Sequence, residues 1–278
     1  MKSRILTAVV GLPILAVILF FNGTIVFNIA IALVCMLAVY EMLHATGYVH
    51  NPVLLLLSMA FAAFVPFSKM EACAPYFTLV LIVYLAGMLA VLFVKHSTVK
   101  FQELAVSFTA ALLLPYGLSS LVFVRDLQPE IGLYPILMVF VFAWISDAGA
   151  YFIGLLFGRH KLAPTISPKK TIEGALGGVF FCILFTVAFT YVYADLVTKS
   201  GIQLTVHLGT MIVLSLLGSI VGILGDLSMS IIKRQTGIKD FGHLMPGHGG
   251  VLDRFDSILF IAPFLYVAIQ MFPIVTVI

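Results

Sequence analysis

Residues 76–94 read YFTLVLIVYLAGMLAVLFV, a predominantly apolar run without a charged side chain. A helix needs about 20 such residues to cross the hydrocarbon core of a bilayer, whereas a barrel strand needs about 10 residues of alternating polarity. Comparable runs recur along the whole chain, at residues 5–22, 25–44, 52–67, 76–94, 103–124, 132–157, 171–195, 205–232 and 257–277. The sequence therefore predicts an all-α, polytopic membrane protein with about nine transmembrane helices.

The composition indicates the same class of protein. Of the 278 residues, 62% are hydrophobic and 10% are charged, against about 45–50% and about 25% in a typical soluble domain. These values exclude a soluble domain, a disordered chain and a secreted disulfide scaffold. The formal net charge of +3 is too small to indicate a nucleic-acid partner, and no basic run stands apart from the apolar segments.

Positive charges are distributed unevenly between the two sides of the predicted helices. With the N-terminus in the cytoplasm, twelve of the fifteen Lys and Arg residues fall on the cytoplasmic side, where these residues are normally enriched. The three on the opposite side are Lys69, Arg125 and Lys199. This orientation also places two polar loops, residues 158–170 and 233–256, in the cytoplasm.

Polar groups are distributed unevenly along the chain as well. Residues 1–125, with about five predicted helices, carry few polar groups within their apolar runs, and we expect them to form a transmembrane scaffold. Residues 126–278 carry acids, glycines and hydroxyls, and we expect the catalytic transmembrane region there. No internal repeat is recognisable, which disfavours a transporter, because many transporters are built from repeated halves.

One carboxylate lies deep within the predicted helix 132–157. Asp147 is about ten residues from the cytoplasmic end of that helix, and a charge at such a depth costs roughly 2.5–3.5 kcal/mol on insertion scales. It should therefore face a bundle interior or an aqueous cavity, or pair with a basic side chain. Ala150, Gly154 and Gly158 follow at spacings of four and predict a face on which a second helix packs closely.

Residues 167–174 read SPKKTIEG and combine two lysines with hydroxyl side chains at the start of a predicted helix. The first backbone N–H groups of a helix point outward, so this combination suits phosphate oxygens. An ordinary basic loop with Thr171 as the helix N-cap explains the stretch equally well. Glu173 could pair with one of the lysines or cap the helix.

The predicted helix 205–232 carries a polar stripe. Its members are Ser219, Gly222, Asp226, Ser230 and Lys233, at spacings of 3, 4, 4 and 3. Residues at these spacings share one face of a helix. A polar face that ends in a carboxylate, a hydroxyl and a lysine indicates a cavity rather than lipid.

The segment after this helix is the most polar in the chain, with residues 233–257 reading KRQTGIKDFGHLMPGHGGVLDRFDS. The glycine-rich run at 246–250 is incompatible with a regular helix and permits close approach to a ligand. Asp253 and Asp256, three residues apart, could share a helical face. Carboxylates combined with substrate phosphates suit magnesium, whereas His243 and His248 lack the usual ligand constellation of zinc.

Together these motifs resemble the phosphatidate cytidylyltransferase (CDP-diacylglycerol synthase) family. Residues 230–256 are similar to its long signature, and the surroundings of Asp147 and residues 167–174 are similar to two further family motifs. The resemblance implies that CTP and phosphatidate are converted to CDP-diacylglycerol and pyrophosphate in phospholipid biosynthesis. It also implies a Mg²⁺-dependent site with an associated K⁺ ion, facing the cytoplasm from the inner (plasma) membrane, and it is compatible with a homodimer.

The resemblance, taken with the residue chemistry, gives each motif residue an expected role. We expect Asp226 and Asp253 to be direct magnesium ligands, supported by the carboxylates of Asp256 and Asp147, and to form the catalytic set with Lys233 and Arg254. The expected substrate contacts are Ser167, Lys169, Lys170, Thr171, Glu173, Ser230, Arg234, Lys239, Asp240, His248, Gly249 and Gly250. No general base is required, because a phosphate monoester is already ionised at neutral pH.

Other functions stay open at this point. A CTP-dependent lipid-alcohol kinase would need the same nucleotide, metal and lipid. A secondary transporter of an anionic substrate would also place acids and cations in the membrane, but its polar cluster should lie near the midplane rather than at the cytoplasmic edge. A CDP-alcohol phosphotransferase would carry a dense motif of spaced aspartates, which this sequence lacks.

Overall fold

The computed structural model describes residues 2–244 and 249–277, and the chain divides into two compact units. Unit 1 comprises Met1–Phe123 and Ile232–Phe255, and unit 2 comprises Val124–Ile231 and Asp256–Ile278. The functional division expected at residue 125, between scaffold and catalytic region, stays a prediction.

Each of the nine apolar runs forms helix. In chain order the helices are α1 (Lys2–Phe20), α2 (Ile25–Ala45), α3 (Pro52–Phe64), the 3-10 turns η1 (Val65–Phe67) and η2 (Ala74–Tyr76), α4 (Phe77–Val94), α5 (Phe101–Arg125), the 3-10 turn η3 (Pro129–Ile131), α6 (Leu133–Phe140), the π-turn η4 (Val141–Ile145), α7 (Ser146–Phe157), α8 (Ile172–Lys199), α9 (Leu208–Gln235), α10 (Leu252–Phe255) and α11 (Ile258–Met271). Four short strands are β1 (Lys161–Ala163), β2 (Ser167–Thr171), β3 (Leu204–Val206) and β4 (Val275–Val277).

Six helical segments among the described residues are long and apolar enough to cross a membrane. They are Ile25–Ala45, Ala74–Val94, Phe101–Arg125, Leu133–Phe157, Ile172–Lys199 and Leu208–Gln235. Three further apolar helices are shorter, at Gly11–Phe20, Pro52–Phe67 and Ile258–Met271. The multi-pass helical class is thus confirmed, whereas the full number of nine spans and the cytoplasmic N-terminus stay predictions.

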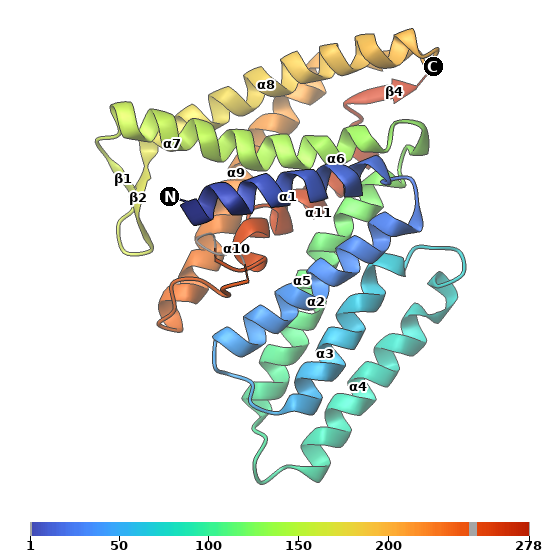
Figure 1. The fold of residues 1–278 in the computed structure, drawn as a ribbon, viewed down its shortest axis with the longest axis vertical. Coiled ribbons are helices and arrows are strands. Elements are labelled where there is room, and N and C mark those ends of the chain that lie inside the picture. Colours follow the sequence, from blue (N-terminus) through green and yellow to red (C-terminus); the bar gives the residue numbers. More distant parts are fainter. Residues whose placement is uncertain (1, 245–248, 278) are drawn as a thin grey trace. The chain divides into compact units, whose positions relative to one another are not determined.

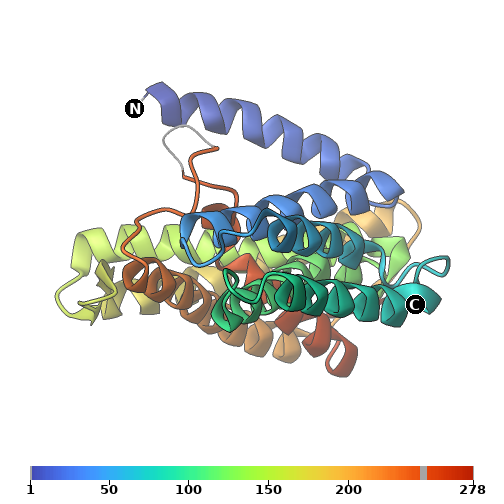
Figure 2. The ribbon, with the colours of Figure 1, turned by 90° about the horizontal axis from the view of Figure 1, so that it is seen from below.

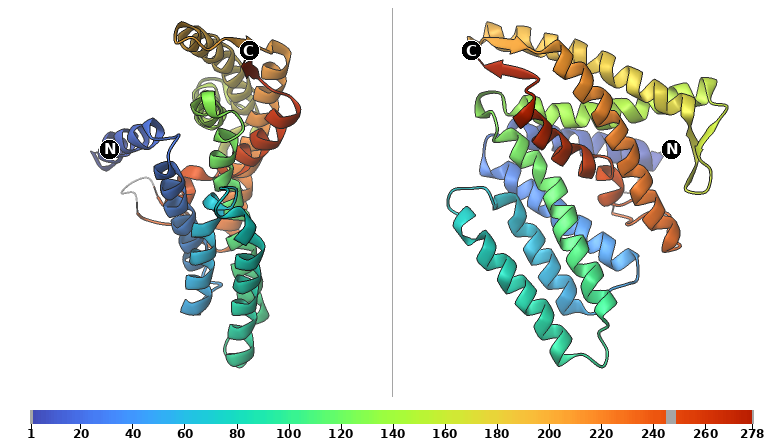
Figure 3. Two further views of the ribbon diagram at one scale, coloured as in Figure 1. Left: turned by 90° about the vertical axis from the view of Figure 1, so that its right-hand side faces the viewer. Right: turned by 180° about the vertical axis from the view of Figure 1, so that it is seen from behind.

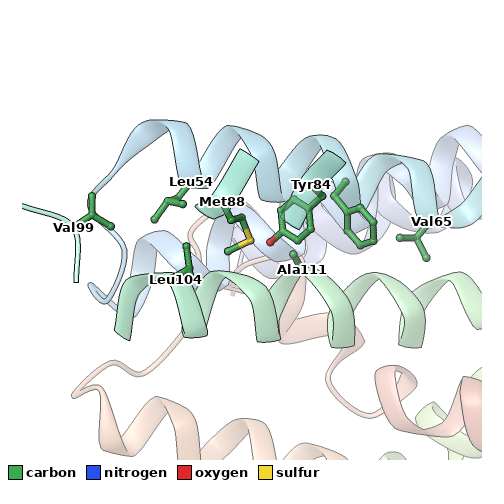
Figure 4. Close-up of a cluster of buried hydrophobic side chains, with 8 residues drawn as sticks. Leu54, Val65, Tyr84, Met88, Val99, Leu104 and Ala111 are labelled. Atoms are coloured by element: carbon green, nitrogen blue, oxygen red, sulfur yellow. The ribbon is translucent and has the colours of Figure 1, made fainter. Parts of the chain in front are cut away.

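In unit 1, α2, α3, α4 and α5 lie side by side (Figures 1 and 3), and α1 leads into α2 through the turn at residues 21–24 (Figure 2). Helix α3 begins where Asn51 accepts a hydrogen bond from the Val53 backbone N–H at 2.9 Å and Pro52 occupies the first helical position. A cluster of buried side chains from α3, η1, α4, α5 and the loop before α5 lies within this unit, with members Leu54, Phe61, Val65, Tyr84, Met88, Val99, Leu104 and Ala111 (Figure 4).

In unit 2, α7 and α8 pack along each other over most of the length of α7 (Figure 1). The backbones approach so closely that a Cβ atom on Gly174 or Gly178 would lie 2.7 or 2.6 Å from a carbonyl oxygen of α7. A Cβ on Gly154 would in turn meet Thr171 Oγ1 at 2.9 Å. The small-residue face predicted for residues 150–158 is therefore confirmed, and its partner helix is α8.

Two antiparallel pairs of strands were not expected from the sequence. The predicted cytoplasmic loop 158–170 contains the hairpin β1–β2, in which Lys161 pairs with Thr171 and Ala163 with Ser167. The helix predicted for 257–277 ends instead at Met271, and β4 pairs with β3 (Figure 3). Pro273 and the β-branched residues at 274–277 favour extended backbone over helix, which explains this difference.

Candidate active site

A cavity of about 430 Å³ in unit 2 gathers much of the chemistry that the sequence predicts. Three lysines line it, Lys161 on β1 and Lys169 and Lys170 on β2, together with Asp147 from α7. The predicted carboxylate of helix 132–157 thus lines a cavity, as expected of a charge in a membrane segment. We call this the lysine cavity.

The hairpin leads directly into α8, and residues of the hairpin form part of the wall of the lysine cavity. Thr171 is the N-cap of α8, with its hydroxyl accepting a hydrogen bond from the Gly174 backbone N–H at 3.1 Å. Glu173 accepts hydrogen bonds from the backbone N–H groups of Arg159 and His160, at 3.1 and 3.2 Å, and also pairs with the His160 ring. Glu173 therefore anchors the start of the hairpin, and its side-chain partner is His160 rather than a lysine of the motif.

Asp226 of α9 forms an ion pair with Lys170, and Ser230 donates a longer hydrogen bond to the same carboxylate at 3.4 Å. The side chains of Lys170 and Asp226 are 25% and 23% exposed, so the pair is reachable by a ligand. About two turns toward the start of α9, Ser219 is fully buried and hydrogen-bonded to Ser146 of α7 at 2.6 Å. The polar stripe of α9 thus faces protein and the Lys170 ion pair rather than lipid.

Unit 1 holds a second pair of a carboxylate and a lysine. Asp253 accepts a hydrogen bond from Lys233 at 3.0 Å on one oxygen, and from the backbone N–H groups of Phe241 and Gly250, at 2.8 and 3.0 Å, on the other. Its side chain is only 3% exposed. Lys233 also lies over the ring of Phe241, 5.4 Å from its centre. Asp253 therefore organises the segment around it as well as neutralising Lys233.

Glu41 belongs to this arrangement, although the sequence pattern alone assigns residues 1–125 to a scaffold and does not single it out. This glutamate of α2 is buried, and its two oxygens accept hydrogen bonds from the backbone N–H groups of Val251 and Leu252, at 2.9 and 2.8 Å. Its only sequence signal is an acid within an apolar helix, four residues before the end of α2.

The remaining predicted residues have varied surroundings. Lys239 and Asp240 line a cavity of about 850 Å³ in unit 1, with Tyr40 and His44 of α2 opposite. Arg234 and Arg254 are exposed, and Asp256 accepts a hydrogen bond from the Ser257 backbone N–H at 2.8 Å. Gly249 has a φ of 85°, a conformation that suits glycine. The predicted substrate residue His248 lies outside the described residues.

Magnesium is commonly held by one or two protein carboxylates together with substrate phosphates and water. Within the described residues, no three His, Cys, Asp or Glu side chains gather into a ready-made metal cluster. Asp226 fits the sparser magnesium pattern, because its carboxylate is partly exposed beside the cations of the lysine cavity. The donor set therefore suits a metal ion that arrives with a phosphate ligand.

Comparison with known proteins relates this chain to cytidylyltransferases. Residues 2–272 match the cytidylyltransferase family. A phosphatidate cytidylyltransferase of Staphylococcus aureus (strain COL) is 34% identical over 271 residues, which cover 95% of this chain and 97% of that protein. A phosphatidate cytidylyltransferase of Bacillus subtilis (strain 168) is 34% identical over 284 residues, 98% of each chain.

Proposed function

Because the chain belongs to the cytidylyltransferase family and converts CTP and phosphatidate to CDP-diacylglycerol and pyrophosphate, we propose that the lysine cavity binds the triphosphate of CTP. This membrane transferase of phospholipid synthesis is thus distinguished from the lipid-alcohol kinase and the transporter that the sequence left open. The observation that carries the proposal is the convergence of Lys161, Lys169 and Lys170 on one cavity beside Asp226.

The reaction determines what the site must supply. An oxygen of the phosphatidate phosphate forms a bond to the α-phosphorus of CTP, the bond from that phosphorus to the bridging oxygen breaks, and pyrophosphate leaves with the electron pair. Both reactants are anions, so positioning and neutralisation of charge are the main requirements. No side chain has to remove a proton, because the attacking phosphate is already ionised.

Three features of the lysine cavity suit the β- and γ-phosphates. Its lysines provide up to three positive charges against the roughly four negative charges of CTP. The cavity wall leads into the N-terminus of α8, whose dipole adds partial positive charge. Asp226 holds Lys170 in an ion pair, and an arriving phosphate offers that lysine a second anionic partner.

Magnesium, with Asp226 as a direct ligand, would neutralise charge on the phosphates when bound. The expectation from the sequence that Asp253 would be a second direct ligand, with Asp147 and Asp256 as supporting carboxylates, stays part of this proposal and rests on the family resemblance. Lys233 and Arg254 complete the catalytic set, with Arg234, Lys239 and Asp240 as further substrate contacts. An associated K⁺ ion is part of the same proposal through the family resemblance alone.

The orientation of the chain is also a proposal. The asymmetry of twelve against three basic residues supports a site that faces the cytoplasm from the inner membrane, where CTP is available. A homodimer is compatible with this arrangement, but it would have to use a surface other than residues 150–158, because α8 of the same chain packs on that face.

Steady-state kinetics in detergent micelles test the assignment of the lysine cavity. Each charge-assisted contact is worth roughly 1.5–3 kcal/mol, or about 10- to 150-fold. We expect Lys169→Gln and Lys170→Gln to raise KM for CTP, or to lower kcat, by about that factor, with little change in the dependence on phosphatidate. Lys199→Gln, at the opposite end of α8 and paired with Asp195, is the matched control and should behave as the unmodified enzyme. A defect confined to the phosphatidate dependence would assign the cavity to the lipid.

A further inference from the structure

Glu41 connects a membrane helix to the signature segment of the family across 210 residues of sequence. Glu41 is 5% exposed, and its carboxylate accepts hydrogen bonds from two consecutive N–H groups at the start of α10, those of Val251 and Leu252. The first N–H groups of a helix lack partners within the helix. Glu41 therefore caps α10 from α2, through two charge-assisted hydrogen bonds in a buried setting.

The adjoining N–H group is held by the second buried carboxylate of unit 1. Gly250 donates to Asp253 at 3.0 Å, so the N–H groups of residues 250, 251 and 252 are all bound by Asp253 or Glu41. The same oxygen of Asp253 accepts from Phe241, and its other oxygen accepts from Lys233. The position of the Lys233–Asp253 pair thus depends on the backbone that Glu41 fixes.

Two glycines of the segment, Gly242 and Gly250, pack directly against the Glu41 carboxylate. A Cβ atom added to Gly242 or to Gly250 would overlap the carboxylate oxygens of Glu41. The backbone of the segment therefore lies in direct contact with the Glu41 carboxylate at both glycines. In this packing each carboxylate oxygen accepts one backbone N–H group at the start of α10.

We propose that Glu41 is a positioning residue for the reaction, acting through the Lys233–Asp253 pair. The inference rests on the proposed function of that pair, because Glu41 itself is assigned no contact with substrate. A neutral glutamine would retain one acceptor oxygen but turn an NH₂ group toward one of the two backbone donors. The start of α10 would then shift, and Asp253 would lose its alignment with Lys233.

The test compares Glu41→Gln with Glu103→Gln in the full chain, in detergent, by kcat/KM and by thermal unfolding. Glu103 is a matched control, because it is also a buried glutamate of unit 1 and also accepts a backbone hydrogen bond, from His50 at 3.0 Å. We expect a loss of about 10- to 100-fold for Glu41→Gln, the usual effect of removing a group that orients a functional side chain. Glu103→Gln should stay within about threefold of the unmodified enzyme, and Glu41→Asp, which keeps the charge, should recover part of the loss.

A double variant separates positioning from general destabilisation. If Glu41 acts through the pair, Glu41→Gln combined with Lys233→Gln should be no worse than Lys233→Gln alone, whereas independent losses would multiply. Multiplying losses, or equal losses in the Glu41 and Glu103 variants, would overturn the inference. A fully active Lys233→Gln variant would instead refute the proposed role of the pair.

A second variant tests the same inference if Glu41→Gln does not fold. Gly242→Ala leaves the buried charge in place and displaces the carboxylate by contact alone. We expect at least a tenfold loss of kcat/KM in this variant, measured at a temperature at which the variant is fully folded, because the overlap also lowers the stability of the fold. Unchanged kinetics in Gly242→Ala would refute the positioning role.

Discussion

The close packing of α7 on α8 makes a quantitative prediction about Gly178. A Cβ atom at this position would lie 2.6 Å from the Ser146 carbonyl oxygen and 3.2 Å from Ala150 Cβ, whereas ordinary contact begins at 3.4 Å. In Gly178→Ala the two helices must therefore part by about 0.8 Å. A gap of that size forfeits a quarter to a half of the dispersion attraction between the facing atoms.

The expected loss of stability is measured against a second glycine in a helix. A Cβ atom added to Gly209, near the start of α9, would meet nothing within 4 Å, so Gly209→Ala gains up to about 1 kcal/mol of helix propensity without a clash. Overpacking costs about 1–3 kcal/mol. Because both variants share the propensity gain, Gly178→Ala should lie below Gly209→Ala by that steric cost.

Thermal unfolding in one detergent and at one scan rate measures the difference. At about 2–4 °C per kcal/mol, Gly178→Ala should unfold roughly 2–12 °C below Gly209→Ala. It should also bind CTP less well, because the displaced helix α7 carries Asp147 to the wall of the lysine cavity. If Gly178→Ala unfolds at or above the temperature of Gly209→Ala, the close approach of α7 and α8 is refuted.

The remaining predictions concern the acids and the orientation of the chain. Asp226→Asn and Asp253→Asn keep the shape of the side chain and remove its charge, so each should lose at least about 100-fold in turnover at saturating magnesium. The unfolding temperature should be retained in Asp226→Asn and lowered in Asp253→Asn, because the buried Asp253 carboxylate holds Lys233 and two backbone N–H groups. Near-normal turnover in either variant removes that residue from the magnesium ligands. In a background with the three native cysteines replaced, Lys199→Cys should react with a membrane-impermeant reagent applied to intact cells, while Lys169→Cys and Lys239→Cys should not; the reverse pattern would invert the proposed topology.

Much of the fold could be predicted, because it depends on the local sequence of each segment. The nine apolar runs become helices because a backbone in lipid must satisfy its own hydrogen bonds, and the small face at residues 150–158 predicts a close helix partner. The identity of that partner, α8, depends on shape complementarity between separate segments. The β3–β4 pair was not predicted for a related reason. An apolar run does not indicate that its last residues pair with a strand about 70 residues earlier in the chain.

The residues of the candidate site could likewise be predicted in part, whereas the contacts between them could not. Lys170, Asp226, Lys233 and Asp253 were predicted because charges within or beside apolar helices are unusual and therefore informative. Their pairing, Lys170 with Asp226 and Lys233 with Asp253, was not predicted, because it joins elements distant in sequence. Glu41 was missed because its partners are backbone N–H groups, which every residue except proline carries and which no sequence pattern marks.

The π-turn η4 between α6 and α7 has a consequence for the direction in which the following helix faces. A π-turn accommodates one residue more than the α-helical turn that it replaces, and one residue corresponds to about 100° of rotation. Everything after Ile145, including the Ser146 hydroxyl that meets Ser219 and the Asp147 carboxylate at the lysine cavity, is therefore rotated by that angle relative to a straight continuation of α6. In genetic terms the turn is equivalent to a single-codon insertion within a helix, and deleting one codon there would turn the polar face of α7 away without exchanging any of its residues.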